Sequence, residues 1–105
     1  SVWVLTMAIL SKASVLAGLG EAIRIRQGHS PDATDLADAP VLSGWALEPI
    51  SAGMVRLVGV VQGHPLLEDG SCTTSAVLAI DAERRWARTV SRYYALAESL
   101  EDLTE

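Results

Sequence analysis

A chain of 105 residues has the size of one domain, and half of its residues are apolar, which is more apolar surface than a small monomer readily buries. Its formal charge of −5, from 13 acidic and 8 basic residues, argues against nonspecific binding to nucleic acid, which needs a basic face. The single cysteine excludes a disulfide within the chain and favours a reducing, cytoplasmic location.

The first predicted element is a long helix over residues 2–27, where apolar residues recur at helical spacing. Five of them form the stripe predicted to cover a sheet: Leu5, Ile9, Leu16, Leu19 and Ile23. Three more form a second apolar side, expected to be free to meet another subunit: Trp3, Met7 and Leu10. The apolar run at the start is too short to span a membrane, so no membrane association is predicted. Met7 is a candidate start residue, which leaves open whether residues 1–6 are native. Gly18 and Gly20 weaken the helix but let another backbone approach closely.

A second, short helix is predicted between residues 30 and 40. Ser30 is a candidate N-cap, Pro31 suits the first helical position, and Pro40 ends the helix. Three acidic residues recur here at every third position: Asp32, Asp35 and Asp38. Carboxylates on one helix face can hold a divalent ion, but capping the helix and keeping it soluble is the stronger interpretation.

After Pro40 the apolar residues take the spacing of strands. Strands are predicted over residues 41–50, 54–62, 72–81 and 86–96. The last two stretches are expected to form one hairpin. Gly59 indicates a bulge or a close contact with another backbone. The last leucines have helical spacing, so the acidic tail is either a short helix or a frayed end.

These elements predict one α+β domain over residues 1–105, divided into a helical part (1–40), a β-rich part (41–97) and an acidic tail (98–105). The long and the short helix are expected to pack on a small antiparallel β-sheet or open barrel of about three to five strands. Trp45 is predicted to be a core or interface anchor.

His64 and Cys72 are the candidates for catalysis, as base and nucleophile, with Asp69 or Asp81 to orient the base. The alternative is a loop histidine and a small buried thiol. Neither histidine has a second ligand at metal spacing, and the sequence has no phosphate-loop, dinucleotide-binding, zinc or nucleophile-elbow motif. No catalytic residue, metal or cofactor is therefore predicted, and a small enzyme using His64 and Cys72 ranks last among the hypotheses.

Hydroxyl and arginine side chains recur in the two strands of the predicted hairpin, at residues 73–75 and 88–92. If the strands pair, these groups gather on one sheet face, which could bind phosphate or carboxylate. The alternative is an ordinary solvated face whose arginines pair with Asp81 or Glu83. The candidates for ligand or nucleic-acid binding are Arg84, Arg85, Arg88, Arg92, Tyr93 and His64.

Three stretches carry a resemblance: residues 31–45 (PDATDLADAPVLSGW), 58–70 (VGVVQGHPLLEDG) and 73–96 (TTSAVLAIDAERRWARTVSRYYAL). They resemble a family of small alphaproteobacterial proteins of unknown function, most specifically in GHPLLEDG and WARTVSRYYAL. The resemblance implies a cytoplasmic bacterial protein and carries no catalytic assignment. It directs attention to the segment 63–70 and to the arginine-containing strand.

The leading hypothesis is a non-enzymatic protein-interaction or regulatory module of a bacterium or mobile element, which forms a homodimer or binds a protein partner. Its support is an apolar, acidic chain without a catalytic constellation. The second hypothesis is a small β domain that binds an anion or nucleic acid through its arginine-rich strand. Nucleic acid is the less favoured ligand because the total charge is negative.

Overall fold

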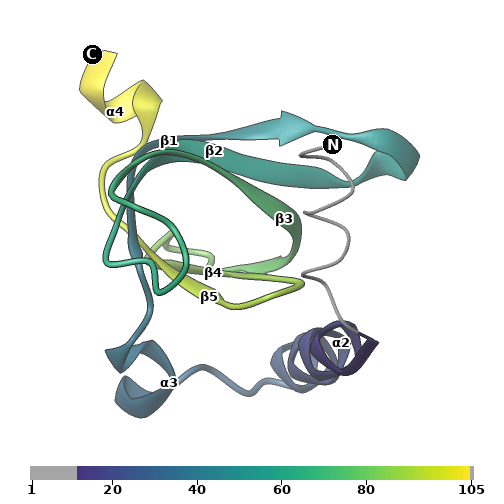
Figure 1. The fold of residues 1–105 in the computed structure, drawn as a ribbon. Helices are drawn as coiled ribbons and strands as arrows, with labels where there is room; N and C mark the ends of the chain where they lie inside the picture. The colour runs from purple at the N-terminus through teal and green to yellow at the C-terminus, as the bar shows by residue number, and fades with distance from the viewer. Residues whose placement is uncertain (1–11, 105) are drawn as a thin grey trace.

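The computed structural model describes residues 12–104 and shows five strands closed into a barrel, with helices outside it (Figure 1). The start of the long predicted helix and the candidate interface residues Trp3, Met7 and Leu10 lie outside the described residues.

The strands are β1 (Val41–Pro49), β2 (Val55–Gln62), β3 (Gly70–Ile80), β4 (Trp86–Thr89) and β5 (Tyr93–Leu96). A short 3-10 turn, η1 (Ser51–Gly53), joins β1 to β2. The three strands predicted before residue 82 are therefore confirmed, with small shifts at their ends. The single strand predicted over 86–96 is wrong, because the chain turns back between Thr89 and Arg92. The backbone N–H of Thr89 donates to the carbonyl of Arg92 at 2.9 Å, and the Thr89 hydroxyl donates to the same oxygen at 3.2 Å.

Neighbouring strands run antiparallel from β1 through β5, and β1 then pairs in parallel with β5. Five strands that alternate in direction begin and end with strands of the same direction, so closing the barrel requires one parallel pair. The α+β class is confirmed, and the barrel is closed rather than open. Closure brings Val41 and Leu42 opposite Ala95 and Leu96, far apart in sequence.

The core fills the barrel interior and consists of Leu42, Trp45, Leu57, Val61, Cys72, Ala87 and Tyr94. Gly59 allows the strands to pack closely: a β-carbon there would lie 2.9 Å from the carbonyl oxygen of Ser43 and 3.1 Å from the Cα of Trp45. The predicted close backbone contact at Gly59 is confirmed. Trp45 is only 4% exposed, so its ring belongs to this core and offers almost no surface to a partner.

The one buried residue of the helix α2 (Lys12–Arg26) is a glycine, so the helix backbone comes closest to the barrel there. Gly18 is buried, and a β-carbon there would come within 2.3 Å of the carbonyl oxygen of Val90. Leu16, Leu19 and Ile23, predicted to cover a sheet, are instead 58%, 45% and 56% exposed. They lie roughly 100–160° around the helix from Gly18, so the close contact at Gly18 leaves them largely exposed at the side of the barrel.

The short helix α3 (Ala33–Ala37) starts at a different residue from the one predicted. Its N-cap is Asp32, not Ser30, and Pro31 precedes the helix. Asp32 Oδ1 accepts from the N–H of Asp35 at 2.8 Å, while Asp35 Oδ2 accepts from the N–H of Asp32 at 3.0 Å. Each of the two side chains accepts from the backbone N–H of the other residue, so two backbone donors are satisfied at once. Ser30 lies too far before this turn to take the same place.

The acidic tail is ordered along β1 and ends in a short helix, α4 (Leu100–Thr104). The indole nitrogen of Trp45 donates to the carbonyl of Ala97 at 2.9 Å, and the N–H of Gly44 donates to the carbonyl of Glu98 at 2.7 Å. Figure 1 shows α4 next to β1, with α2 and α3 on the side of β4 and β5. Among the described helices, none is long and apolar enough to cross a membrane.

Candidate functional site

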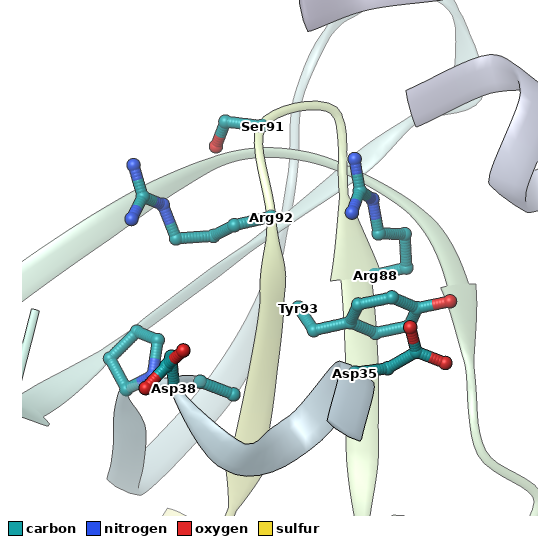
Figure 2. A pocket seen from close by; sticks show the side chains of 8 residues that line it. Asp35, Asp38, Arg88, Ser91, Arg92 and Tyr93 are labelled. Atoms are coloured by element: carbon teal, nitrogen blue, oxygen red, sulfur yellow. The ribbon is translucent and has the colours of Figure 1, made fainter. Parts of the chain in front are cut away.

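An open cleft of about 230 Å³ lies between α3, with the residues that follow it, and the β4–β5 hairpin (Figure 2). We call it the arginine cleft. It is lined by Asp35, Asp38, Ala39, Pro40, Arg88, Ser91, Arg92 and Tyr93. One wall is therefore acidic and comes from the helix side, while the other is basic and comes from the hairpin. Small-ligand pockets are usually about 300–1,000 Å³, so this cleft is smaller than most of them and has room for only a few atoms of a ligand.

The tight turn from Thr89 to Arg92 places two arginines on neighbouring strands. Arg88 lies opposite Tyr93 in the β4–β5 pairing, and its guanidinium sits over the Tyr93 ring at 5.1 Å from the centroid. In the view of Figure 2 the guanidinium groups of Arg88 and Arg92 lie on either side of Ser91. The hairpin thus presents two cations and a hydroxyl together.

Neither arginine of the cleft forms an ion pair with another described residue. Arg85, instead, pairs with Asp81 at 2.8 Å and with Glu83 at 3.6 Å. The interpretation in which Arg88 or Arg92 is neutralised by these acids is therefore wrong. The Nε of Arg88 is buried and finds no hydrogen-bond acceptor in the part of the chain that the structure describes. Leaving a buried donor without an acceptor costs about 1–3 kcal/mol.

Three hydroxyls gather next to the arginines. Ser91 Oγ lies 3.3 Å from Ser75 Oγ and 3.4 Å from Thr89 Oγ1. Of the hydroxyl run 73–75, Ser75 alone contacts this group. Thr74 is buried elsewhere, where its hydroxyl accepts from the N–H of Leu57 at 3.0 Å. The structure therefore brings together serine and threonine hydroxyls from β3, β4 and the turn, as pairing of the two segments predicts.

The acidic wall is held apart from the arginines by its own contacts. The carboxylate of Asp35 is fixed in the capping pair with Asp32, and Figure 2 shows it beside the Tyr93 ring. The carboxylate of Asp38 makes no ion pair or hydrogen bond with any residue that the structure describes. The sequence does not predict that an acidic wall faces the arginines. Its one indication is the spacing of the acids at every third residue, which favours helix capping.

Tyr93 connects the arginine cleft to α2. It is 7% exposed, and its hydroxyl donates to Glu21 Oε2 at 2.8 Å. Burial first, and then the hydrogen bond to Glu21, raise the pKa of Tyr93 to about 12. The same hydrogen bond is the largest cause that lowers the pKa of Glu21, and Arg24, which pairs with Glu21 at 2.8 Å, acts in the same direction. The hydrogen bond from Tyr93 to Glu21 thus joins the helix to the barrel beside Arg88.

The other candidate arginines lie outside the cleft. Arg84 is in the turn before β4, with a φ of 58°, and its guanidinium is 5.9 Å from the centre of the Trp45 ring. Arg85 is occupied by its two acids. Only Arg88, Arg92 and Tyr93 of the predicted set line the arginine cleft.

No hydrogen bond between described residues joins His64 to Cys72. His64 Nδ1 accepts from the N–H groups of Leu66 and Leu67 at 3.0 and 3.1 Å, so the ring proton belongs on Nε2. Burial, followed by the charge of Arg92, lowers the pKa of His64. Burial raises the pKa of the Cys72 thiol, against smaller opposing effects of Tyr94 and Arg92. The one ring nitrogen of His64 that could accept a proton is thus occupied by backbone N–H groups, so His64 is not arranged as a base for Cys72.

No group of three histidine, cysteine, aspartate or glutamate side chains among residues 12–104 is arranged to hold a metal ion. The chemistry that remains in the arginine cleft is charge and hydrogen bonding. Two guanidinium groups and a serine hydroxyl can donate to an anion, and two carboxylates can accept from a cation.

Comparison with known proteins places the chain in a family without adding an activity. Neither the search of curated proteins nor the search of solved structures finds a match. Residues 11–105, nearly the whole chain, match a family described as a family of unknown function, DUF6634. The chain therefore belongs to this family of unknown function.

Proposed function

We propose that this domain is a non-enzymatic binding module whose arginine cleft recognises the anionic group of a small molecule. The observation that carries the proposal is the pair Arg88 and Arg92, which line a cleft and form no ion pair with a described residue, in a chain that carries a net charge of −5. Glu21 is the acid nearest in effect, because the charge of Arg88 helps to lower its pKa. Arginine presents a planar set of donors that suits phosphate and carboxylate.

The surroundings of the two arginines support binding rather than chemistry. The side chain of Ser91 lies between them in Figure 2, and the buried Nε of Arg88 lacks an acceptor among the residues described. The histidine and the thiol nearest to catalysis are held as a neutral base and a protonated thiol, chiefly by burial. An anion in the cleft would meet fixed donors, but no activated nucleophile.

Isothermal titration calorimetry with inorganic phosphate and with acetate, at low salt, tests this function. We expect binding that weakens as salt rises, and a loss of about tenfold or more in Arg92→Gln, since hydrogen bonds to charged groups contribute about 1.5–3 kcal/mol. Arg26→Gln is the matched control, because it removes the same charge from an exposed position on α2. An equal loss in both variants, or no binding of either anion at low salt, would contradict the proposal. Salt-sensitive binding of an oligonucleotide alone would favour the nucleic-acid hypothesis instead.

Self-association is the second candidate function, and the exposed stripe Leu16, Leu19 and Ile23 on α2 favours it. Leu19 and Ile23 also line a groove of about 210 Å³ with Leu78 of β3, and Arg26 stands at the same groove. We propose that a second copy of the chain covers this surface. Its further support is that half the residues are apolar, more than one small barrel buries.

Sedimentation equilibrium of the wild type and of Leu19→Gln tests self-association. We expect a dimer at micromolar concentration in the wild type and a monomer with unchanged circular dichroism in the variant. Leu66→Gln is the control, because Leu66 is an exposed leucine in the loop after β2. A wild-type chain that stays monomeric at all concentrations would rule the dimer out.

We also propose that the domain works in the reducing cytoplasm of a bacterium. The support for the compartment is that the one cysteine, Cys72, is buried and has no second cysteine to pair with in the chain. The support for the bacterial origin is the resemblance described for residues 31–45, 58–70 and 73–96.

A further inference from the structure

The arginine cleft has walls of opposite charge that do not neutralise each other. Arg88 and Arg92 line one wall and Asp35 and Asp38 line the other, and no ion pair between described residues crosses it. In a cleft of about 230 Å³, opposite charges that could reach each other would be expected to pair.

Local contacts on each wall keep the charges apart. The capping pair with Asp32 holds the carboxylate of Asp35 on α3. Asp38 follows as the C-cap, with its N–H donating to the carbonyl of Leu36. On the other wall, Arg88 lies over the Tyr93 ring, and Tyr93 is itself fixed by its hydrogen bond to Glu21. One charged side chain on each wall, Asp35 and Arg88, is therefore held in place before any ligand arrives, which reduces the entropy cost of binding.

This charge pattern disfavours a simple anion as the complete ligand. An anion bound between the arginines gains attraction from two cations but is repelled by two carboxylates across a narrow space. A ligand that also carries a cation turns this repulsion into attraction. Tyr93 and Pro40 are buried and form the floor of the cleft, so the polar groups of its two walls are the ones that would contact a ligand.

We infer that the ligand of the arginine cleft is a small zwitterion, with a phosphate or carboxylate end toward Arg88, Ser91 and Arg92 and a protonated amine toward Asp38 and Asp35. This inference rests on the proposed function and deepens it, because it adds the second charge and its partners. The juxtaposition of a fixed acidic wall and a fixed basic wall carries it.

Two matched ligand pairs test the inference by calorimetry near neutral pH. Phosphoethanolamine is compared with ethyl phosphate, and β-alanine with propionate, so that each pair differs chiefly by an amine. We expect the zwitterion of at least one pair to bind about three- to tenfold more tightly than its partner, the size expected of a partly exposed charged contact. The pair that shows the preference identifies phosphate or carboxylate as the anionic end.

Asp38→Asn then assigns the preference to the acidic wall. We expect this variant to lose the preference while binding ethyl phosphate or propionate as well as the wild type does, or slightly better. Glu101→Gln, which removes a charge from the exposed α4, should keep the preference. Wild-type binding that is equal within both pairs, or a preference that survives Asp38→Asn, overturns the zwitterion inference and leaves the anion-binding function standing. If no compound of either pair binds, the proposed function itself fails.

Discussion

Gly18 and Gly20 lie two residues apart on α2, but Gly18 is packed against the barrel and Gly20 faces open space. A β-carbon at Gly18 would come within 2.3 Å of the carbonyl oxygen of Val90, which belongs to the backbone and cannot swing aside. A β-carbon at Gly20 would meet nothing within 4 Å. The same substitution therefore has opposite signs at the two positions, because helix propensity acts at both while steric overlap acts only at Gly18.

We predict that Gly18→Ala lowers the free energy of unfolding by about 1–3 kcal/mol, although alanine is the better helix former. Gly20→Ala is expected to raise it by about 0.5–1 kcal/mol. Urea unfolding followed by circular dichroism measures both. Equal stabilisation by the two substitutions would mean that α2 does not rest on Val90 as the structure shows.

Individual residues differ in how well their roles could be predicted from the sequence. The close approach at Gly59 was predictable, because a glycine inside a run of valines weakens the strand and marks a place where another backbone comes close. Which arginine pairs with Asp81 could not be predicted from the sequence. It depends on the turn before β4, where Arg84 has positive φ and Arg85 donates to Asp81 through both its backbone and its side chain. That geometry leaves the next arginine, Arg88, for the cleft.

At the scale of elements, α2 is attached to the barrel by a hydrogen bond that titrates. Tyr93 has its pKa raised to about 12 from an ordinary value of 10.0, by burial first and then by its bond to Glu21. Between these two values the unfolded chain loses the phenolic proton while the folded chain keeps it. The stability that this group contributes is therefore present below pH 10 and is lost as pH rises toward 12.

We predict that Tyr93→Phe removes this alkaline loss, which amounts to about 1–3 kcal/mol in the wild type between these pH values. Urea unfolding of both proteins across alkaline pH measures it. Tyr94, whose pKa burial also raises to about 12, is present in both chains and cancels in the comparison. On the acid side, the lowered pKa of Glu21 means that its contribution is present above its ordinary pKa and is lost as pH falls through the lowered one. Parallel alkaline curves for the two proteins would contradict the attachment through Tyr93.

Elements were predictable where one physical signal dominated. Strands β2 and β3 follow from runs rich in β-branched residues bounded by turn residues, whereas β1 was indicated only by an extended stretch between two prolines. The turn from Thr89 to Arg92 was hidden, because neither glycine nor proline marks it and its bonds come from a threonine. The face of α2 was predicted wrongly because apolar spacing does not show that a helix can dock through a glycine backbone.

At the scale of the whole molecule, closure of the barrel determines where the acidic wall of the cleft lies. Pairing of β1 with β5 brings the residues just before β1 next to the hairpin, where Pro40 accepts at its carbonyl from the N–H of Ala95 at 3.0 Å. The sequence predicts the elements but contains no local signal for this pairing, which joins residues more than fifty positions apart. The basic wall of the site was therefore predictable, and its combination with Asp38 was not.

Closure of the barrel also depends on hydrogen bonds between β1 and the residues that follow β5. The carbonyls of Ala97 and Glu98 accept from the Trp45 indole and from the N–H of Gly44, and the N–H of Ala97 donates to Leu42. A chain ending at Leu96 loses all three bonds, whereas a chain ending at Ser99 keeps them and lacks only α4.

We expect the shorter chain to lose about 2–4 kcal/mol of unfolding free energy, since a buried indole N–H loses its acceptor and two backbone bonds are removed. The chain that ends at Ser99 should lose clearly less. Urea unfolding measures both, and Trp45 emission should shift to longer wavelength in the shorter chain when Trp3 and Trp86 are replaced by phenylalanine. If both truncations cost the same, α4 rather than the tail bonds closes the barrel. Because Pro40 and β5 meet at this same closure, the shorter chain should also bind anions more weakly in the arginine cleft than the chain ending at Ser99.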